Sequence, residues 1–469
     1  MRKTLAALDA AREDRARLWS ARAGRLCALV PQVGPQAVDL GAWAFALPFG
    51  GYILWWVLGF GDMVWPVAAL WMAASWFGVR GFSVPWPWVL WGVFVLWMPL
   101  TFLMLDTPGR LVGALYRYIL VVAATVFAMH LHNARKNLPL RKVLTVITLF
   151  LVSATLGGYL AMAFPQLVVH TPLSFVLPKG LLANELVHDI AIRRTSQWNP
   201  NSYIDSEPRP SAPFLYANTW GNVYSLVLPL SLVHLRLEWA LHSRWRWPVA
   251  AVIAASVVPA VNTLNRGMFI GLGVVALWVA VQYLLAGRWK GVGAGAGMLL
   301  AGTFIWTVSP AGVEFFDRLA TTKSTVDRLS LYFATLKDIA ESPVIGFGAP
   351  RPAPNPWLPA LGTQGHFWTV LFSHGFVGVT LFVGFLVAVI LMGAGRRDLL
   401  GAVLVGTVAA TLVESAFYGM TTGLFVTLAA VALLTRGDSV EAEVARLSSP
   451  LPRGRSRGRA SRSRRFVRG

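Results

Sequence analysis

Long apolar runs recur along the whole chain and determine its predicted architecture. Each is close to the roughly 20 residues that a helix needs to cross about 30 Å of hydrocarbon. Pro and Gly inside several runs are compatible with membrane helices when neighbouring groups satisfy the freed backbone. The pattern predicts an all-α polytopic membrane protein with about 12 transmembrane helices, near residues 40–60, 62–78, 86–105, 111–131, 141–163, 214–235, 247–262, 267–286, 291–308, 366–392, 398–417 and 419–435.

The composition supports this class. Of the 469 residues, 56% are hydrophobic and only 13% are charged, which is too little charge to cover a soluble protein of this length. Residues 1–36 are basic and lack the apolar centre of a cleavable signal, so the first span is expected to direct its own insertion. The single cysteine, Cys27, excludes an intramolecular disulfide and a cysteine metal cluster.

Lysine and arginine alternate between the two sides of the predicted spans. With a cytoplasmic N-terminus, the inner side receives most of them, including the clusters at 135–142, 236–246 and 396–397. Cytoplasmic loops carry such an excess. The pattern therefore predicts a multi-pass protein of the plasma membrane with both termini in the cytoplasm.

Loop lengths and composition divide the chain further. Residues 1–36 form a basic cytoplasmic segment, and 37–435 form the transmembrane domain, with large extracytoplasmic loops at 164–213 and 309–365. Residues 436–469 are low in complexity and are predicted to form a disordered, basic cytoplasmic tail. Because the net charge of +20 is concentrated beside the spans and in the tails, we expect anionic lipids as partners there and no nucleic acid.

Three groups of polar residues are placed at the outer ends of spans, where ionisable groups usually have a function. Arg209 precedes the sixth span, and Asn218 follows about one turn inside it. Arg266 occupies a very short outer turn between two apolar runs. The third group is the stretch GTQGHFWTVLFSHGFVG at 362–378, with Gln364, His366 and His374.

Each of these residues also has an ordinary structural interpretation. Arg266 could reach lipid headgroups with its long side chain, and Arg209 could be a solvated loop residue. His366 could be a hydrogen-bonded residue at a helix end, and His374 a buried packing histidine with one hydrogen bond. The convergence of the three groups on one side of the membrane favours a functional site.

Two arginines and a histidine fit one type of reaction. Arginine presents a permanently charged fork that matches phosphate oxygens. Histidine can accept a hydroxyl proton near neutral pH. When a sugar leaves a lipid diphosphate, arginines can neutralise the departing charge in place of a divalent ion. The combination indicates glycosyl transfer at the outer face, with no metal or other cofactor.

Several short motifs in residues 205–380 carry a resemblance to a known family. They are Arg209 ahead of Phe214 and Asn218, Arg266-Gly267 entering an apolar helix, DRLSLYFATLKDIAESPVIGFG with Arg328, Pro343, Gly346 and Gly348, and His366 ahead of Gly375 and Gly378. In this order, on a helical membrane scaffold, they resemble the O-antigen ligase and O-antigen polymerase superfamily of membrane glycosyltransferases.

The resemblance implies a GT-C-like fold and a metal-independent ligase or polymerase of cell-envelope polysaccharide. The donor would be an undecaprenyl-diphosphate-linked glycan and the acceptor another glycan. By the same resemblance, Arg209 and Arg266 would bind the diphosphate and His366 would be the base. Substrate contacts would come from Arg328, Gln364, Asn218 and His374.

The register of the histidine departs from the family pattern. There the histidine precedes the helix glycine by eleven residues, whereas His366 precedes Gly375 by nine, and counting back eleven reaches Gln364. An amide cannot act as a base near neutral pH. We expect His366 to be the base, and Arg209, Arg266 and either His366 or Gln364 to surround one outward-opening cavity.

Two other interpretations remain. A transporter or lipid flippase would carry ionisable residues inside its spans, and Arg117 and Glu414 are such residues. Asp62, in the first outer loop, is placed where another class of membrane glycosyltransferase has a catalytic carboxylate, although a helix cap is the simpler role. The large outer loops favour the enzyme.

Overall fold

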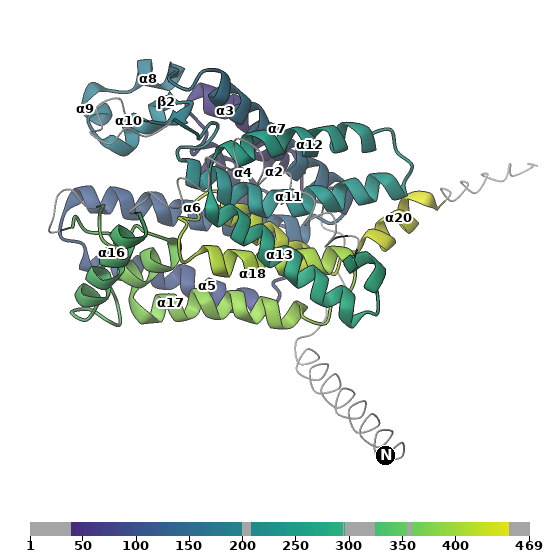
Figure 1. Cartoon of the computed structure of the whole chain (residues 1–469). Coiled ribbons are helices and arrows are strands. Elements are labelled where there is room, and N and C mark those ends of the chain that lie inside the picture. Colours follow the sequence, from purple (N-terminus) through teal and green to yellow (C-terminus); the bar gives the residue numbers. More distant parts are fainter. Residues whose placement is uncertain (1–38, 199–207, 294, 296–323, 354–358, 450–469) are drawn as a thin grey trace, which may run out of the picture.

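Helices dominate the computed structural model, which describes residues 39–198, 208–293, 295, 324–353 and 359–449 (Figure 1). The longer helices mostly follow the predicted apolar runs, except that α16 (Ser324–Ile339) lies in the predicted outer loop 309–365. They are α2 (Trp43–Gly50), α3 (Tyr52–Leu58), α4 (Val64–Ala74), α5 (Pro87–Leu100), α6 (Pro108–Asn133), α7 (Leu140–Ala163), α11 (Ala217–Ala240), α12 (Arg246–Asn262), α13 (Arg266–Leu285), α16 (Ser324–Ile339), α17 (His366–Gly393), α18 (Leu399–Glu414) and α19 (Gly423–Arg436). Most of the predicted span at 291–308 lies outside the described residues.

The helical membrane class is supported by length and apolarity. Within the described residues, 5 helices are long and apolar enough to cross a membrane: α5 with its 3-10 extension η1 (Thr101–Met104), α6, α7, α13 and α17. The bent pair of α19 and α20 (Val440–Ser448) would make 6. Helices α4, α12 and α18 are apolar but shorter. The structure therefore shows a helical protein with several potential spans, and the number 12 stays a prediction.

The bundle core is built from helices distant in the sequence. Helix α11 packs against α7, α13 and α18, while α19 packs against α6 and α17 against α5. Aromatic rings fill the centre, where Trp65 stacks on Phe425 at 4.3 Å between centroids and Phe49 meets Trp65 edge-on at 4.8 Å. Such pairs add to the stabilisation from burial.

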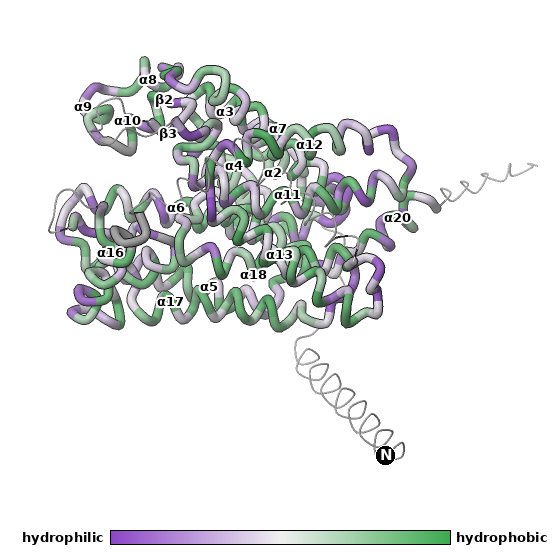
Figure 2. Tube along the Cα trace, viewed as in Figure 1, coloured by the Kyte–Doolittle hydropathy of each residue, from purple (hydrophilic) through white to green (hydrophobic). Residues whose placement is uncertain are grey.

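Hydrophilic residues gather mostly at the two ends of the long helices (Figure 2). At the end where α20 lies, Arg141 pairs with Glu238 at 2.6 Å and Lys136 with Asp39 at 2.8 Å. Arg396 also donates to the Asp438 carbonyl, at 2.6 Å. The positive-charge pattern assigned these segments to one side of the membrane, and the structure brings them together at one end.

The first large loop is folded. Strand β1 (Val168–His170) pairs antiparallel with β2 (Ile192–Arg194), and β3 (Ser196–Gln197) pairs with β4 (Arg209–Pro210). Between β1 and β2 lie the short helices α8 (Pro172–Val176), α9 (Lys179–Leu182) and α10 (Glu185–Ala191). A buried ion pair of 3.1 Å between Arg193 and Asp62 ties this loop to the bundle. Asp62 therefore acts as an ion-pair partner and not as a helix cap.

The start of the C-terminal tail differs from the prediction. Residues 436–469 were expected to be disordered, but Val440–Ser448 form helix α20. The Ser439 side chain accepts from the Ala442 N–H, and Glu443 binds Arg446 at 2.7 Å. A capped first turn and a glutamate–arginine pair stabilise this short helix. Residues 450–469 lie outside the described part.

The orientation can be tested with two glycines at opposite ends. Gly180 in α9 and Gly395 after α17 are exposed, and a side chain added at either finds no atom within 4 Å. In a Cys27→Ser background, a membrane-impermeant maleimide applied to intact spheroplasts should label Gly180→Cys and leave Gly395→Cys unlabelled until the membrane is permeabilised. The reverse labelling pattern would contradict the predicted orientation.

Candidate active site

Helix α17 is broken at Gly375. This glycine has φ 68° and ψ −170°, a conformation outside the helical region that glycine adopts without steric cost. The rings of His366 and Phe382 lie 5.0 Å apart, whereas sixteen positions of a straight helix extend about 24 Å. The half-helix 366–374 is therefore bent back toward the second half at Gly375, and the predicted span 366–392, although long and apolar enough to cross a membrane, is not a straight helix.

The loop 343–348 fills this break. The N–H groups of Phe347 and Gly348 donate to the carbonyls of Phe372 and Ser373 at 2.9 and 2.8 Å, and Phe376 N–H donates to Pro343 O at 2.7 Å. Gly346 has φ 76°, and an added Cβ would lie 2.6 Å from Gly375 N. The proline and glycines of the SPVIGFG motif thus allow the loop to replace the hydrogen bonds that the break removes.

A second segment, 415–418, holds the N-terminus of the half-helix. The first N–H groups of a helix have no partner within it. Here His366 N–H donates to Tyr418 O at 2.7 Å, and Phe367 N–H donates to Ser415 O at 2.8 Å. Gly365 lies so close that an added Cβ would be 2.6 Å from Ala416 O. These contacts fix the backbone that carries His366.

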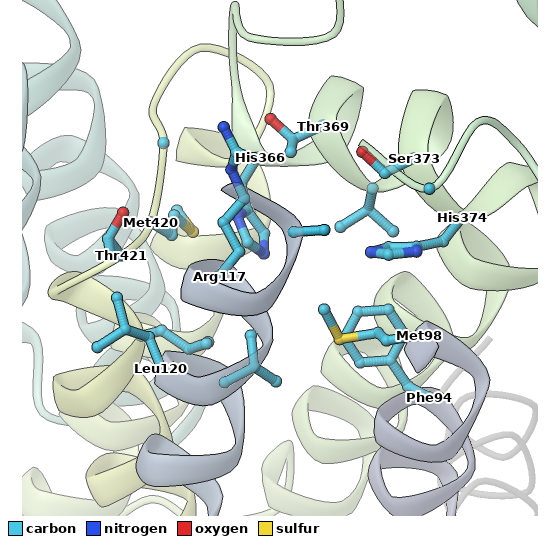
Figure 3. Close-up of a pocket in the computed structure, with 16 residues that line it drawn as sticks. Phe94, Met98, Arg117, Leu120, His366, Thr369, Ser373, His374, Met420 and Thr421 are labelled. Carbon is cyan, nitrogen blue, oxygen red and sulfur yellow. The ribbon is translucent and has the colours of Figure 1, made fainter. Parts of the chain in front are cut away.

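The half-helix borders a cavity of about 90 Å³ (Figure 3). His366 Nε2 and Ser373 Oγ are buried and have no hydrogen-bond partner among the described residues. Buried polar atoms are normally paired, so two such atoms on one cavity mark it as a candidate binding site. The lining residues are Phe94, Met98, Ala114, Arg117, Leu120, Val121, Gly348, His366, Thr369, Val370, Ser373, His374, Gly419, Met420, Thr421 and Leu424.

Arg117 of α6 brings positive charge to this cavity. Figure 3 shows its side chain beside His366, with Ser373 and His374 across from them. Its Nη1 donates to Gly113 O at 3.2 Å, one turn back in its own helix. Within the part of the chain that the structure describes, no ion pair involves Arg117, and no acidic side chain lines the cavity.

The structure distinguishes the three polar residues of the stretch 362–378. His366 lines the cavity, and Gln364 does not; it lies in the preceding turn, where its carbonyl accepts from Tyr332 Oη at 3.4 Å. His374 is 5% exposed, and its Nδ1 lies 2.8 Å from Thr101 Oγ1. His374 therefore has the expected packing contact and also borders the cavity.

Arg209 and Arg266 both lie at the turn between α12 and α13. Arg209 Nε donates to Thr263 O at 2.9 Å, and Arg266 begins α13 directly after this turn. Asn218 lies in the first turn of α11, next to Ala217, whose carbonyl accepts from Asn265 at 3.0 Å. The three predicted residues are thus gathered around the turn between α12 and α13, and neither arginine lines the cavity.

Segment 415–418 connects this turn with His366. The Tyr418 hydroxyl donates to the Asn265 side chain, while the Tyr418 carbonyl accepts from His366 N–H. A Cβ on Gly267 would lie 2.4 Å from the Phe417 ring. The arginine-bearing turn and the histidine-bearing half-helix therefore pack on the same short segment. The Arg328 side chain lies outside the described residues, although its backbone belongs to α16.

Arg110 was not anticipated from the sequence. It donates to the carbonyls of Phe347, Ala349 and Pro350 at 2.7, 2.5 and 3.1 Å and so holds the loop that fills the α17 break. The Arg110 guanidinium also hydrogen-bonds Asp106 at 2.5 Å, which holds the pKa of that carboxyl below its usual value. Among cavity residues, Arg117 had a sequence signal, a charge inside an apolar run, and Ser373 had none.

No protein-family model matches the chain, and no curated protein matches it. Any proposal for its function therefore depends on the residues of the site.

The break in α17 can be tested by restoring a side chain to it. In Gly375→Ala, the new Cβ would lie 2.1 Å from Val344 O at a positive φ, so we expect a loss of about 2 kcal/mol or more of stability. Thermal unfolding of the purified protein in detergent measures this effect.

Gly384→Ala is the matched control, because it lies in the same helix and its added Cβ meets nothing within 4 Å. We expect its melting temperature to equal or exceed that of the wild type. Equal melting temperatures for Gly375→Ala and the wild type would show that the break is not required.

Proposed function

We propose that this protein transfers a polyprenyl-diphosphate-linked glycan to an acceptor sugar at the outer face of the plasma membrane. It would be a metal-independent glycosyltransferase of the envelope-polysaccharide ligase or polymerase type. The observation that carries the proposal is His366, whose Nε2 is buried and unpartnered among the described residues and borders a cavity with an arginine.

A general base needs a free ring nitrogen within reach of the hydroxyl that it deprotonates. In the proposed reaction, the acceptor hydroxyl oxygen attacks the anomeric carbon of the donor, and His366 Nε2 takes the hydroxyl proton. The bond between the anomeric carbon and the phosphate oxygen breaks, and its electrons leave with the polyprenyl diphosphate. Backbone contacts of the half-helix with segment 415–418 hold His366 in place for this step.

The departing diphosphate needs positive charge. Arg209 and Arg266 lie at the turn that packs on the same segment as His366, and arginine binds phosphate oxygens with paired N–H groups. Fixed cations aimed at developing charge lower the barrier more than they stabilise the ground state. Asn218, at the same turn, is a candidate contact for the donor, and Gln364, His374 and Arg328 are candidates for other substrate contacts.

The proposal can be tested by envelope glycan analysis of a deletion strain that expresses His366→Ala or Arg266→Ala. Loss of a general base typically reduces the rate by about 10²–10⁴-fold, so His366→Ala should stop glycan transfer. Arg266→Ala should stop it as well, because it removes a cation that would bind the departing diphosphate. Accumulated lipid-linked repeat units would identify a polymerase, and accumulated lipid-linked polymer would identify a ligase.

His170→Ala and Arg194→Ala are matched controls, since both residues are exposed in the first large outer loop, 164–213. We expect wild-type glycans from both controls at equal expression levels. A wild-type glycan profile from His366→Ala and Arg266→Ala would contradict the ligase and the polymerase alike.

A transporter or flippase is the second candidate, and Glu414 is the observation in its favour. This residue is fully buried between helices, where Oε2 accepts from Asn222 at 2.6 Å and Oε1 has no hydrogen-bond partner among the described residues. Ionisable residues at membrane depth often mark transport pathways.

Glu414→Gln distinguishes the two candidates, because the amide keeps the size of the carboxyl and an oxygen for Asn222. We expect this variant to retain glycan transfer in the same envelope assay. If Glu414→Gln instead leaves lipid-linked glycan on the inner leaflet while His366→Ala has no effect, the transporter is the correct function.

A further inference from the structure

We infer that the cavity beside His366 is a binding site for a phosphate group, with the Arg117 guanidinium and the Ser373 hydroxyl as its donors. The identification of that group as part of a lipid diphosphate rests on the proposed function. The inference of an anion site does not, because it follows from the charges and unsatisfied atoms of the cavity.

The positive charge of Arg117 has no counter-ion among the described residues that line the cavity. Arg117 lies in α6, one of the helices able to cross a membrane, and its side chain borders the cavity. No acidic side chain lines this cavity among the described residues, and the one hydrogen bond found for Arg117 goes to the neutral Gly113 carbonyl. A partly buried charge without a counter-ion is costly, and a bound anion would offset that cost.

The cavity also has a buried hydroxyl without a hydrogen-bond partner among the described residues. Ser373 is only 2% exposed, and its Oγ has no partner among the described residues although its backbone carbonyl is bound by Gly348. Leaving a buried hydroxyl unpaired is unfavourable. Phosphate oxygens accept hydrogen bonds from hydroxyls and guanidinium groups alike, so one anion would satisfy both donors.

The apolar surroundings of the site also favour the binding of an anion to Arg117. Apolar side chains form much of the wall, including Phe94, Met98, Leu120 and Leu424. Such walls lower the local dielectric constant and strengthen the attraction between Arg117 and an anion. The guanidinium fork matches carboxylate and phosphate alike, but a third donor, the Ser373 hydroxyl, suits the additional oxygen of a phosphate group.

The location connects this site with the proposed reaction. Arg117 lies beside His366 (Figure 3). Segment 415–418 holds the His366 backbone, and the turn that precedes Arg266 packs on the same segment. A diphosphate has two phosphate groups, so one could bind at Arg117 and the other near Arg266. Arg117 would then be a positioning residue that keeps the donor's leaving group near the base.

Binding to purified full-length protein in detergent tests the inference. The probes are undecaprenyl diphosphate, undecaprenol and inorganic pyrophosphate, and the variants are Arg117→Gln, Arg117→Lys and Ser373→Ala. We expect Arg117→Gln to weaken undecaprenyl diphosphate binding by about tenfold or more and Ser373→Ala by about three- to tenfold. Arg117→Lys should recover part of the loss, because it keeps the charge without the fork.

Arg80→Gln is the control, since Arg80 is exposed on a loop, and it should bind like the wild type. Pyrophosphate binding that depends on Arg117 would show a site for the free anion, whereas dependence with undecaprenyl diphosphate alone would show a lipid headgroup site. Unchanged binding of undecaprenyl diphosphate to Arg117→Gln, or equally tight binding of undecaprenol, would overturn the inference.

Two further outcomes keep the conclusions separate. If Arg117→Gln does not fold, wild-type affinity in both Arg117→Lys and Ser373→Ala would overturn the inference. If the wild type binds undecaprenyl diphosphate through Arg117 but transfers no glycan, the anion site stands and the proposed function fails.

Discussion

The structure depends on how the broken helix α17 satisfies its backbone. At membrane depth, peptide groups have no water to bind, so irregular backbone is stable only where protein groups replace the lost partners. Loop 343–348 supplies three hydrogen bonds at the break, and segment 415–418 supplies two at the N-terminus of the half-helix. Gly346, Gly365 and Gly375 allow the close approaches that these bonds require.

The same hydrogen bonds define the candidate site. They hold His366 at the cavity, beside Arg117, and the turn that precedes Arg266 packs on the same segment 415–418. Arg110 strengthens the arrangement from α6 by binding the carbonyls of Phe347, Ala349 and Pro350, at the end of the loop that fills the break and just after it. A histidine, a cavity and several cations are thus supported by backbone contacts between segments far apart in the sequence, and the proposed reaction would use this preorganisation.

The helices were predictable because an apolar run of sufficient length has few alternatives to a helix in a membrane. The predicted span 141–163, for example, corresponds to α7 at Leu140–Ala163. The break at Gly375 was not predictable, since a glycine inside an apolar run is compatible with a straight helix as well. His366 and the two arginines were selected by residue type and side of the membrane. Ser373 and the partners of Arg110 depend on tertiary contacts that no local pattern encodes.

The central claim is that this chain itself transfers a glycan from a lipid diphosphate. The most direct measurement uses purified protein in liposomes with an undecaprenyl-diphosphate-linked glycan, an acceptor glycan and a metal chelator. The account predicts that the wild type releases undecaprenyl diphosphate and forms the acceptor conjugate, and that His366→Ala does neither. Unchanged lipid-linked glycan with the wild type, or equal product formation by His366→Ala, would contradict it.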